Sequence, residues 1–321
     1  MKLKFSSVAL AVTLAAASFG AQASLIGMAD LTITQLLLRN STPVSPGVYT
    51  YLTPADINIV GGSRVSNNNA VLNGSLLSSS AGAGAVGDAN AIYECNGACG
   101  SPALLAAYAS GGGLSDNTTT HILTPIVPAL KYALGDSKIS GSALAGGAAG
   151  FTRADSELSG PKNSSSANGN LANEVAAKFT AATSRLVDFQ VTYDALVRTF
   201  IDAQHYGVTG ASSVLATNQF TVSVFDETDG VDLLFAGAKT WSPVDLNRSG
   251  STNTAINGTA KNFASSGTIY SPSVLLLSGH DYSLNITQNS SVILRSVPEP
   301  ASMLLIGLGL AAIGFASRRR A

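Results

Sequence analysis

Residues 186–203 read LVDFQVTYDALVRTFIDA, and the alternation in this stretch decides the fold class. Apolar side chains are separated by single polar ones, with Val187, Phe189, Val191 and Tyr193 alternating with Asp188, Gln190 and Thr192. A period of two is typical of a strand that buries one face and exposes the other to water. We therefore expect a long, half-buried β-strand here.

Two later segments repeat this pattern. Residues 220–237, FTVSVFDETDGVDLLFAG, place apolar runs on both sides of a polar turn at Asp229-Gly230, which predicts a β-hairpin. Residues 281–288, DYSLNITQ, put Tyr282, Leu284 and Ile286 on one face. Alternating strands at a spacing of roughly ten residues are typical of two antiparallel sheets packed face to face. The sequence thus predicts a mainly β chain folded as an antiparallel β-sandwich.

The first half of the chain is less regular. Short apolar runs at residues 31–38, 49–53 and 57–60 are separated by Gly, Ser and Asn, and a low-complexity stretch covers residues 78–91. Such runs predict short strands with long turns. Short helices are expected at residues 104–109 and 126–134, the second limited by Pro128. A division of residues 24–296 into two sub-parts near 150–170 stays open.

The first 23 residues have the parts of a secretory signal peptide. Lys2 and Lys4 form a positive start, residues 5–17 are apolar, and Ala21-Gln22-Ala23 is a small-x-small cleavage site. We expect cleavage before Ser24 and export across an inner membrane. The alternative, a buried N-terminal helix, leaves this order of features unexplained.

The last stretch, residues 297–321, reads VPEPASMLLIGLGLAAIGFASRRRA. Residues 301–317 carry no charge and span about 25 Å as a helix, which is enough for one membrane crossing. The run ends at Arg318, Arg319 and Arg320, which by the positive-inside rule hold the C-terminus in the cytoplasm. Pro298 and Pro300 favour an extended linker before the span. We expect one C-terminal transmembrane helix with residues 24–296 outside the cytoplasm.

This tail resembles a known sorting signal. Val297, Pro298, Glu299 and Pro300, the apolar run and the arginine cluster are together similar to the PEP-CTERM signal of Gram-negative surface proteins. The resemblance implies recognition by an exosortase, a membrane-embedded cysteine transpeptidase that cuts near the Pro-Glu-Pro and moves the protein from the inner membrane to a new attachment. It also implies a structural or adhesive role at the cell surface or in the exopolysaccharide matrix of a biofilm. The alternative is an ordinary single-span anchor.

Two segments of the body also resemble PEP-CTERM proteins. Residues 275–292, LLLSGHDYSLNITQNSSV, are similar to the last segment of β-sandwich members. Residues 154–161, ADSELSGP, resemble the EDSAxxP pattern of one subgroup, but the initial Glu is absent and the spacing differs. The first resemblance implies the same fold, and the second leaves subgroup membership open.

Composition and motifs give no sign of catalysis. Outside the two targeting segments, 13 basic and 18 acidic residues remain, so the exported part is mildly acidic and offers no reason to expect nucleic acid. His121, His205 and His280 are scattered and fit no nucleophile or metal frame. The sequence has no G-x-S-x-G, H-E-x-x-H or phosphate-binding glycine loop. We expect a protein that is not an enzyme and needs no cofactor.

The only cysteines are Cys95 and Cys99, in the sequence ECNGACG. In an oxidising compartment, with Asn96-Gly97 between them to form a tight turn, they predict a local disulfide. A metal site would need two more ligands, and only His121 lies at all near in sequence.

Calcium is considered at two acidic loops. Residues 245–250, DLNRSG, match the start of a calcium loop, with oxygen ligands at Asp245, Asn247 and Ser249, but the twelfth position is Ile256. Asp226, Glu227, Asp229 and Asp232 gather in the predicted hairpin turn. The alternative at both places is a solvated polar loop.

Trp241 is the only tryptophan. A single Trp is more often a core residue than a platform for stacking sugars. A surface-anchored carbohydrate-binding module that uses Trp241, and that calcium stabilises, is the alternative to a structural or adhesive protein.

Overall fold

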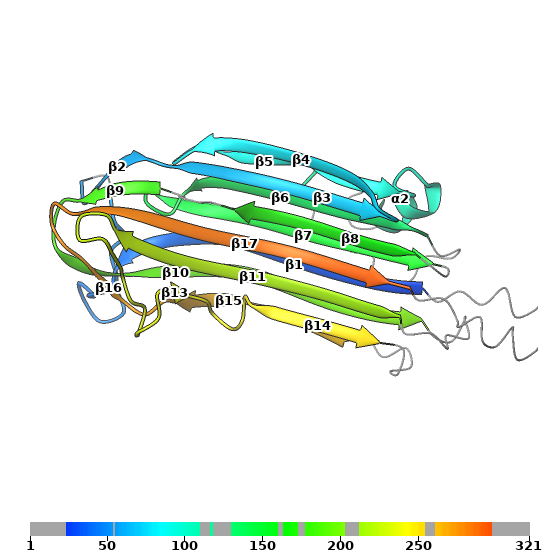
Figure 1. Cartoon of the computed structure of the whole chain (residues 1–321). Helices are drawn as coiled ribbons and strands as arrows, with labels where there is room; N and C mark the ends of the chain where they lie inside the picture. Colours follow the sequence, from blue (N-terminus) through cyan, green and yellow to red (C-terminus); the bar gives the residue numbers. More distant parts are fainter. Residues whose placement is uncertain are drawn as a thin grey trace, which may run out of the picture.

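The computed structural model describes residues 24–53, 55–109, 116–117, 130–159, 163–172, 177–202, 212–253 and 261–296. These residues form two antiparallel sheets (Figure 1). The first sheet has the order β15 (Lys261–Tyr270), β10 (Arg185–Asp202), β1 (Ser24–Asn40), β7 (Gly147–Ser159), β6 (Tyr132–Ser142) and β5 (Ala89–Gly97), with β16 (Val274–Leu276) paired to β10.

The second sheet has the order β12 (Val231–Asp232), β11 (Ser213–Asp226), β17 (Asp281–Arg295), β8 (Ser164–Ala172), β3 (Ser63–Leu72) and β4 (Ser75–Gly84). β13 (Thr240–Trp241) and β14 (Arg248–Asn253) also pair with β11, and β9 (Ala177–Ala181) joins β17 to β2 (Ile57–Gly61). Strands from before and after residues 150–170 lie next to one another in both sheets.

The predicted β class with antiparallel sheets is confirmed. Residues 186–202 lie in one long strand, β10, and residues 220–232 form the predicted hairpin through a turn at residues 227–230. The helix predicted at residues 104–109 lies within α2 (Pro102–Ala109).

The helix predicted at residues 126–134 is wrong for its described last part. Tyr132 begins β6, and it pairs with Glu157 of β7 on one side and Gly97 of β5 on the other. Residues 49–53 also form no strand, apart from one isolated bridge between Tyr51 and Arg39. Long-range pairing prevails over local helix propensity at Tyr132, because both neighbouring ladders satisfy its backbone.

The body is elongated, and both ends of the described chain lie at one end of it (Figure 1). Ser24 pairs with Asp202 and Ser159, whereas Arg295 pairs with Ser213 and Ser164. We call this the tail end. The opposite, distal end carries the start of β17, whose 15 residues span roughly 50 Å at about 3.4 Å per residue.

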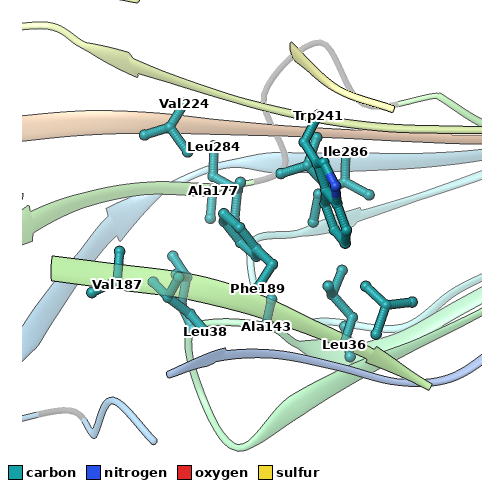
Figure 2. Close-up of a cluster of buried hydrophobic side chains, with 14 of the residues drawn as sticks. Leu36, Leu38, Ala143, Ala177, Val187, Phe189, Val224, Trp241, Leu284 and Ile286 are labelled. Atoms are coloured by element: carbon teal, nitrogen blue, oxygen red, sulfur yellow. The ribbon is translucent and has the colours of Figure 1, made fainter. Parts of the chain in front are cut away.

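The distal half has a core of large apolar side chains contributed by both sheets (Figure 2). Phe189 of β10 and Leu284 of β17 point into it from the two sheets. Trp241 lies in the same core, 8% exposed, with its ring edge-on to Phe220 at 6.1 Å between centroids. The core role expected for a single tryptophan is therefore confirmed, and Trp241 offers no exposed platform.

The half nearer the tail end packs with small side chains instead. A Cβ placed on Gly169 of β8 would lie 2.6 Å from the carbonyl oxygen of Arg153 on the facing sheet, and one on Gly135 would lie 2.8 Å from that of Asn69. Sheets usually pack about 10 Å apart, so here the two backbones approach unusually closely. Small residues such as Gly, Ala and Ser, which are frequent in this chain, allow the two sheets to pack this closely.

Polar side chains complete this half of the interior. The amide of Asn68 donates to the carbonyls of Ala91 and Ile92 at 2.9 and 3.0 Å, and the hydroxyl of Ser66 donates to the carbonyl of Ser137 at 2.7 Å. Asn68, Ser66 and Ser137 are fully buried. Their hydrogen bonds offset the cost of removing these groups from water.

Candidate functional site

The tail end holds the backbone that leads into the sorting segment. Arg295 ends β17, and the N–H of Ser296 donates to the carbonyl of Asn163 at 2.9 Å. The amide of Asn163 in turn donates to the carbonyl of Ser159 at 2.8 Å. The chain is thus fixed up to Ser296, directly before Val297. The predicted sorting residues Val297 to Pro300 and Arg318 to Arg320 lie outside the described residues.

β17 is an interior strand of its sheet, and this position determines how the body resists a force applied to its C-terminus. It pairs with β11 along residues 282–295, and with β8 on its other side over residues 288–295. Val292 and Leu294 are fully buried and pack with Gly27 and Val214 of the tail-half core. A force along β17 therefore loads two hydrogen-bonded ladders at once, rather than opening one from an edge.

Helix α2 is too short to cross a membrane, and none of the described segments contains a longer apolar helix. The transmembrane helix predicted at residues 301–317 lies outside the described residues, as does the signal peptide at residues 1–23.

The comparisons with known proteins bear on this end of the chain. The family described as PEP-CTERM protein-sorting motif matches residues 296–320, immediately after β17. The chain therefore carries a PEP-CTERM sorting motif in its tail. The PEP-CTERM motif makes it an exported protein that is recognised by an exosortase and processed at the membrane. No curated protein and no solved structure matches the chain.

The two cysteines form the predicted local disulfide. Cys95 at the end of β5 is bonded to Cys99, with their Cα atoms 5.9 Å apart. Both pack against a small cluster that includes Leu104 of α2, Tyr132 and Leu134. The disulfide therefore fixes the turn that brings α2 onto the first sheet.

The three side chains considered as calcium ligands at residues 245–250 have other partners or positions in the structure. The amide of Asn247 donates to the carbonyls of Phe220 and Pro243 at 2.8 Å, and its oxygen accepts from the N–H of Phe220 at 3.0 Å. Asp245 accepts from Arg248 at 3.2 Å, and Ser249 lies in β14 opposite Thr217. The loop is therefore hydrogen-bonded to β11 through Asn247. Ile256 lies outside the described residues.

The four acidic side chains considered in the hairpin turn have different partners from one another. Glu227 is 3.4 Å from Lys178, and Asp232 is 2.6 Å from Lys239. Asp226 and Asp229 instead face His280, whose Nδ1 lies 2.9 and 3.8 Å from their carboxylate oxygens. The sequence did not predict this contact between His280 and the two aspartates, although antiparallel pairing of residues 220–226 with 282–288 would have brought His280 to the turn.

A second feature that sequence reasoning missed is the tyrosine patch, formed by Tyr270 at the end of β15 and by Tyr49 and Tyr51 in the segment after β1. The Arg39 guanidinium lies between the rings of Tyr49 and Tyr270, 3.9 and 4.0 Å from their centroids. It donates to both carboxylate oxygens of Asp188, at 2.5 and 3.1 Å. Tyr51 and Tyr270 are about half exposed. The patch is therefore an aromatic surface held in place by a buried ion pair.

The first sheet also buries an acid in β6. Asp136 is almost fully buried, and its Oδ2 accepts from the N–H of Asn117 at 2.7 Å. Burial, reinforced by the nearby charge of Asp116, raises the pKa of Asp136 to about 7, against the opposing effects of the Asn117 N–H and of Arg153. This carboxyl therefore changes charge near neutral pH. His121 and His205 lie outside the described residues.

Proposed function

We propose that this exported protein is a spacer of the cell surface or exopolysaccharide matrix, with a structural or adhesive role and no catalytic one. Its exosortase would transfer it from the inner membrane to an attachment on the outside of a Gram-negative cell. The observation that carries the proposal is the position of Arg295 at one end of an elongated sandwich, directly before the sorting motif.

The geometry supports a body that is attached by its tail end. Attachment through the processed C-terminus leaves the distal end roughly 50 Å from the attachment, given the length of β17. The interior position of β17 resists a pull between the two ends, because both of its ladders must break together. Rigid length and resistance to extension suit a structural role.

Protease accessibility on intact cells tests this orientation. One variant carries a protease site in the Asp229-Gly230 turn at the distal end, and its matched control carries the same site in the Asn73-Gly74 turn at the tail end. On cells the distal site should be cut first, whereas in the purified protein both sites should be cut at similar rates. Equal rates on cells, or faster cutting at the tail end, would contradict the proposal.

Carbohydrate binding is the second candidate function, favoured by the tyrosine patch in place of the buried Trp241. Aromatic rings combine an apolar face with a polar tip, and the hydroxyl of Tyr51 is already 3.4 Å from the amide oxygen of Gln190. Exopolysaccharide from the host would be the probe, measured by affinity electrophoresis. Tyr270→Ala should reduce retardation, while Ile92→Ala, an exposed residue on β5, should not. Unchanged retardation in Tyr270→Ala would exclude this role for the patch.

A further inference from the structure

Two loops meet at the distal end and bring three potential metal ligands together. One loop is the turn after β11, and the other precedes β17 (Figure 1). The N–H of Glu227 donates to the carbonyl of Asp281 at 2.8 Å, and the N–H of Asp281 donates to the hydroxyl of Thr228 at 2.9 Å. These bonds fix the two loops against each other and hold His280 opposite Asp226 and Asp229.

The three groups lie close enough together to share one metal ion. One ligand atom each from Asp226, Asp229 and His280 lies within 4.8 Å of the other two. Nδ1 of His280 is 2.9 Å from Oδ2 of Asp226 and 3.8 Å from Oδ2 of Asp229. Zinc bonds of about 2.0–2.2 Å at tetrahedral angles separate neighbouring ligand atoms by roughly 3.4 Å. The two observed separations lie on either side of that value.

Hydrogen bonds orient the Asp226 carboxylate for such a role. Oδ1 of Asp226 accepts from the N–H groups of Thr228 and Asp229, at 2.9 and 3.1 Å, while Oδ2 faces His280. Burial would raise the pKa of Asp226, but the N–H of Asp229, His280 and the N–H of Thr228 together lower it below its ordinary value, so the group is ionised at neutral pH. Hydrogen bonds that orient a ligating carboxylate are usual around protein metal sites.

The neighbouring acids are engaged elsewhere. Glu227 faces Lys178, Asp232 faces Lys239, and Asp281 accepts from the hydroxyl of Thr180. The ligand set at this point is therefore one imidazole with two carboxylates. Calcium prefers six to eight oxygen ligands, whereas imidazole with carboxylate suits zinc and related transition ions.

We propose that Asp226, Asp229 and His280 bind one divalent transition ion of the zinc type, with Nδ1 of His280 and one oxygen of each carboxylate as ligands. The remaining coordination positions would hold water or a group from a partner. The ion would join the β11–β12 turn to the loop before β17 at the end of the sandwich farthest from the sorting motif. This inference does not depend on the spacer proposal.

Titration of the processed protein, purified from its host and freed of metal by a chelator, tests the site. Zinc chloride should bind with a stoichiometry of one. His280→Gln should weaken binding at least tenfold, and Asp229→Asn should also weaken it, because each removes a ligand. Asp232→Asn is the matched control, since Asp232 pairs with Lys239 and should leave the affinity unchanged.

A second measurement does not rely on variants that could misfold. Cobalt chloride added to the wild-type protein should shift the ring resonances of His280 in the NMR spectrum and produce visible absorption bands with one equivalent. The proposal is overturned if zinc shows no saturable binding, if His280→Gln binds zinc as tightly as wild type, if calcium displaces zinc at equal concentration, or if cobalt leaves the His280 resonances unmoved.

Discussion

Replacement of Gly169 by alanine tests the close approach of the two sheets near the tail end. The added Cβ would contact the carbonyl of Asp136 and would lie 2.6 and 2.8 Å from the carbonyl oxygen and the nitrogen of Arg153. These are backbone atoms of β6 and β7, so no side chain can turn away to make room. Overpacking a core usually costs about 1–3 kcal/mol, and we expect Gly169→Ala to reach at least the top of that range because whole strands must separate.

Urea denaturation of the processed protein measures this effect. Gly169→Ala should lower the free energy of unfolding by about 3 kcal/mol or more, seen as a lower midpoint at an unchanged slope. The matched control is Gly267→Ala on the edge strand β15, where an added Cβ meets no atom within 4 Å. It should leave stability within about 0.5 kcal/mol. A loss below 1 kcal/mol for Gly169→Ala would refute the inference that the backbones touch there.

Three further predictions concern the ionisable and covalent features of the body. Because burial raises the pKa of Asp136 to about 7, the native state binds this proton more tightly than the unfolded chain, so stability should fall as pH rises from about 4 to 7. Asp136→Asn should reduce the fall in the free energy of unfolding between pH 5 and pH 8, measured with urea, by about 3 kcal/mol. Asp188→Ala leaves the buried Arg39 without its carboxylate and should lower the free energy of unfolding by about 3–5 kcal/mol. The control, Asp194→Ala on the exposed face of the same strand, should lower it by less than about 0.5 kcal/mol. Similar losses in both variants would show that the ion pair does not stabilise the fold. The double variant Cys95→Ser, Cys99→Ser should lose at most about 2 kcal/mol of its free energy of unfolding, because the disulfide closes a short loop with a sequence separation of 4. Thermal or urea unfolding measures this loss, and a variant that is globally unfolded would contradict the prediction.

Local alternation predicted the long strands well. Residues 186–202 and 281–288 bury one face each, so their period of two is visible in the sequence, and the turn at Asp229-Gly230 marks the hairpin. The first half was harder to predict. Tyr132 and its neighbours in β6 are buried on both faces, which removes the alternation and leaves an apolar run that resembles a short helix.

The sites show the same limit. The sorting motif and the disulfide are contiguous in sequence, so their residues could be identified without the fold. His280 is far from Asp226 in sequence, and only the pairing of β11 with β17 brings them together. The tyrosine patch likewise needs the pairing of β10 with β15, which places Tyr270 beside Gln190. Its residues carry no motif of their own.

The measurement that tests the central claim most directly is the intact mass of the protein from its native host, compared between wild type and Glu299→Ala. We predict that the wild-type protein begins at Ser24 and lacks the apolar run and the arginines after the Pro-Glu-Pro, whereas the variant keeps its tail and stays in the inner membrane. A complete tail in the mature wild-type protein would contradict processing by an exosortase.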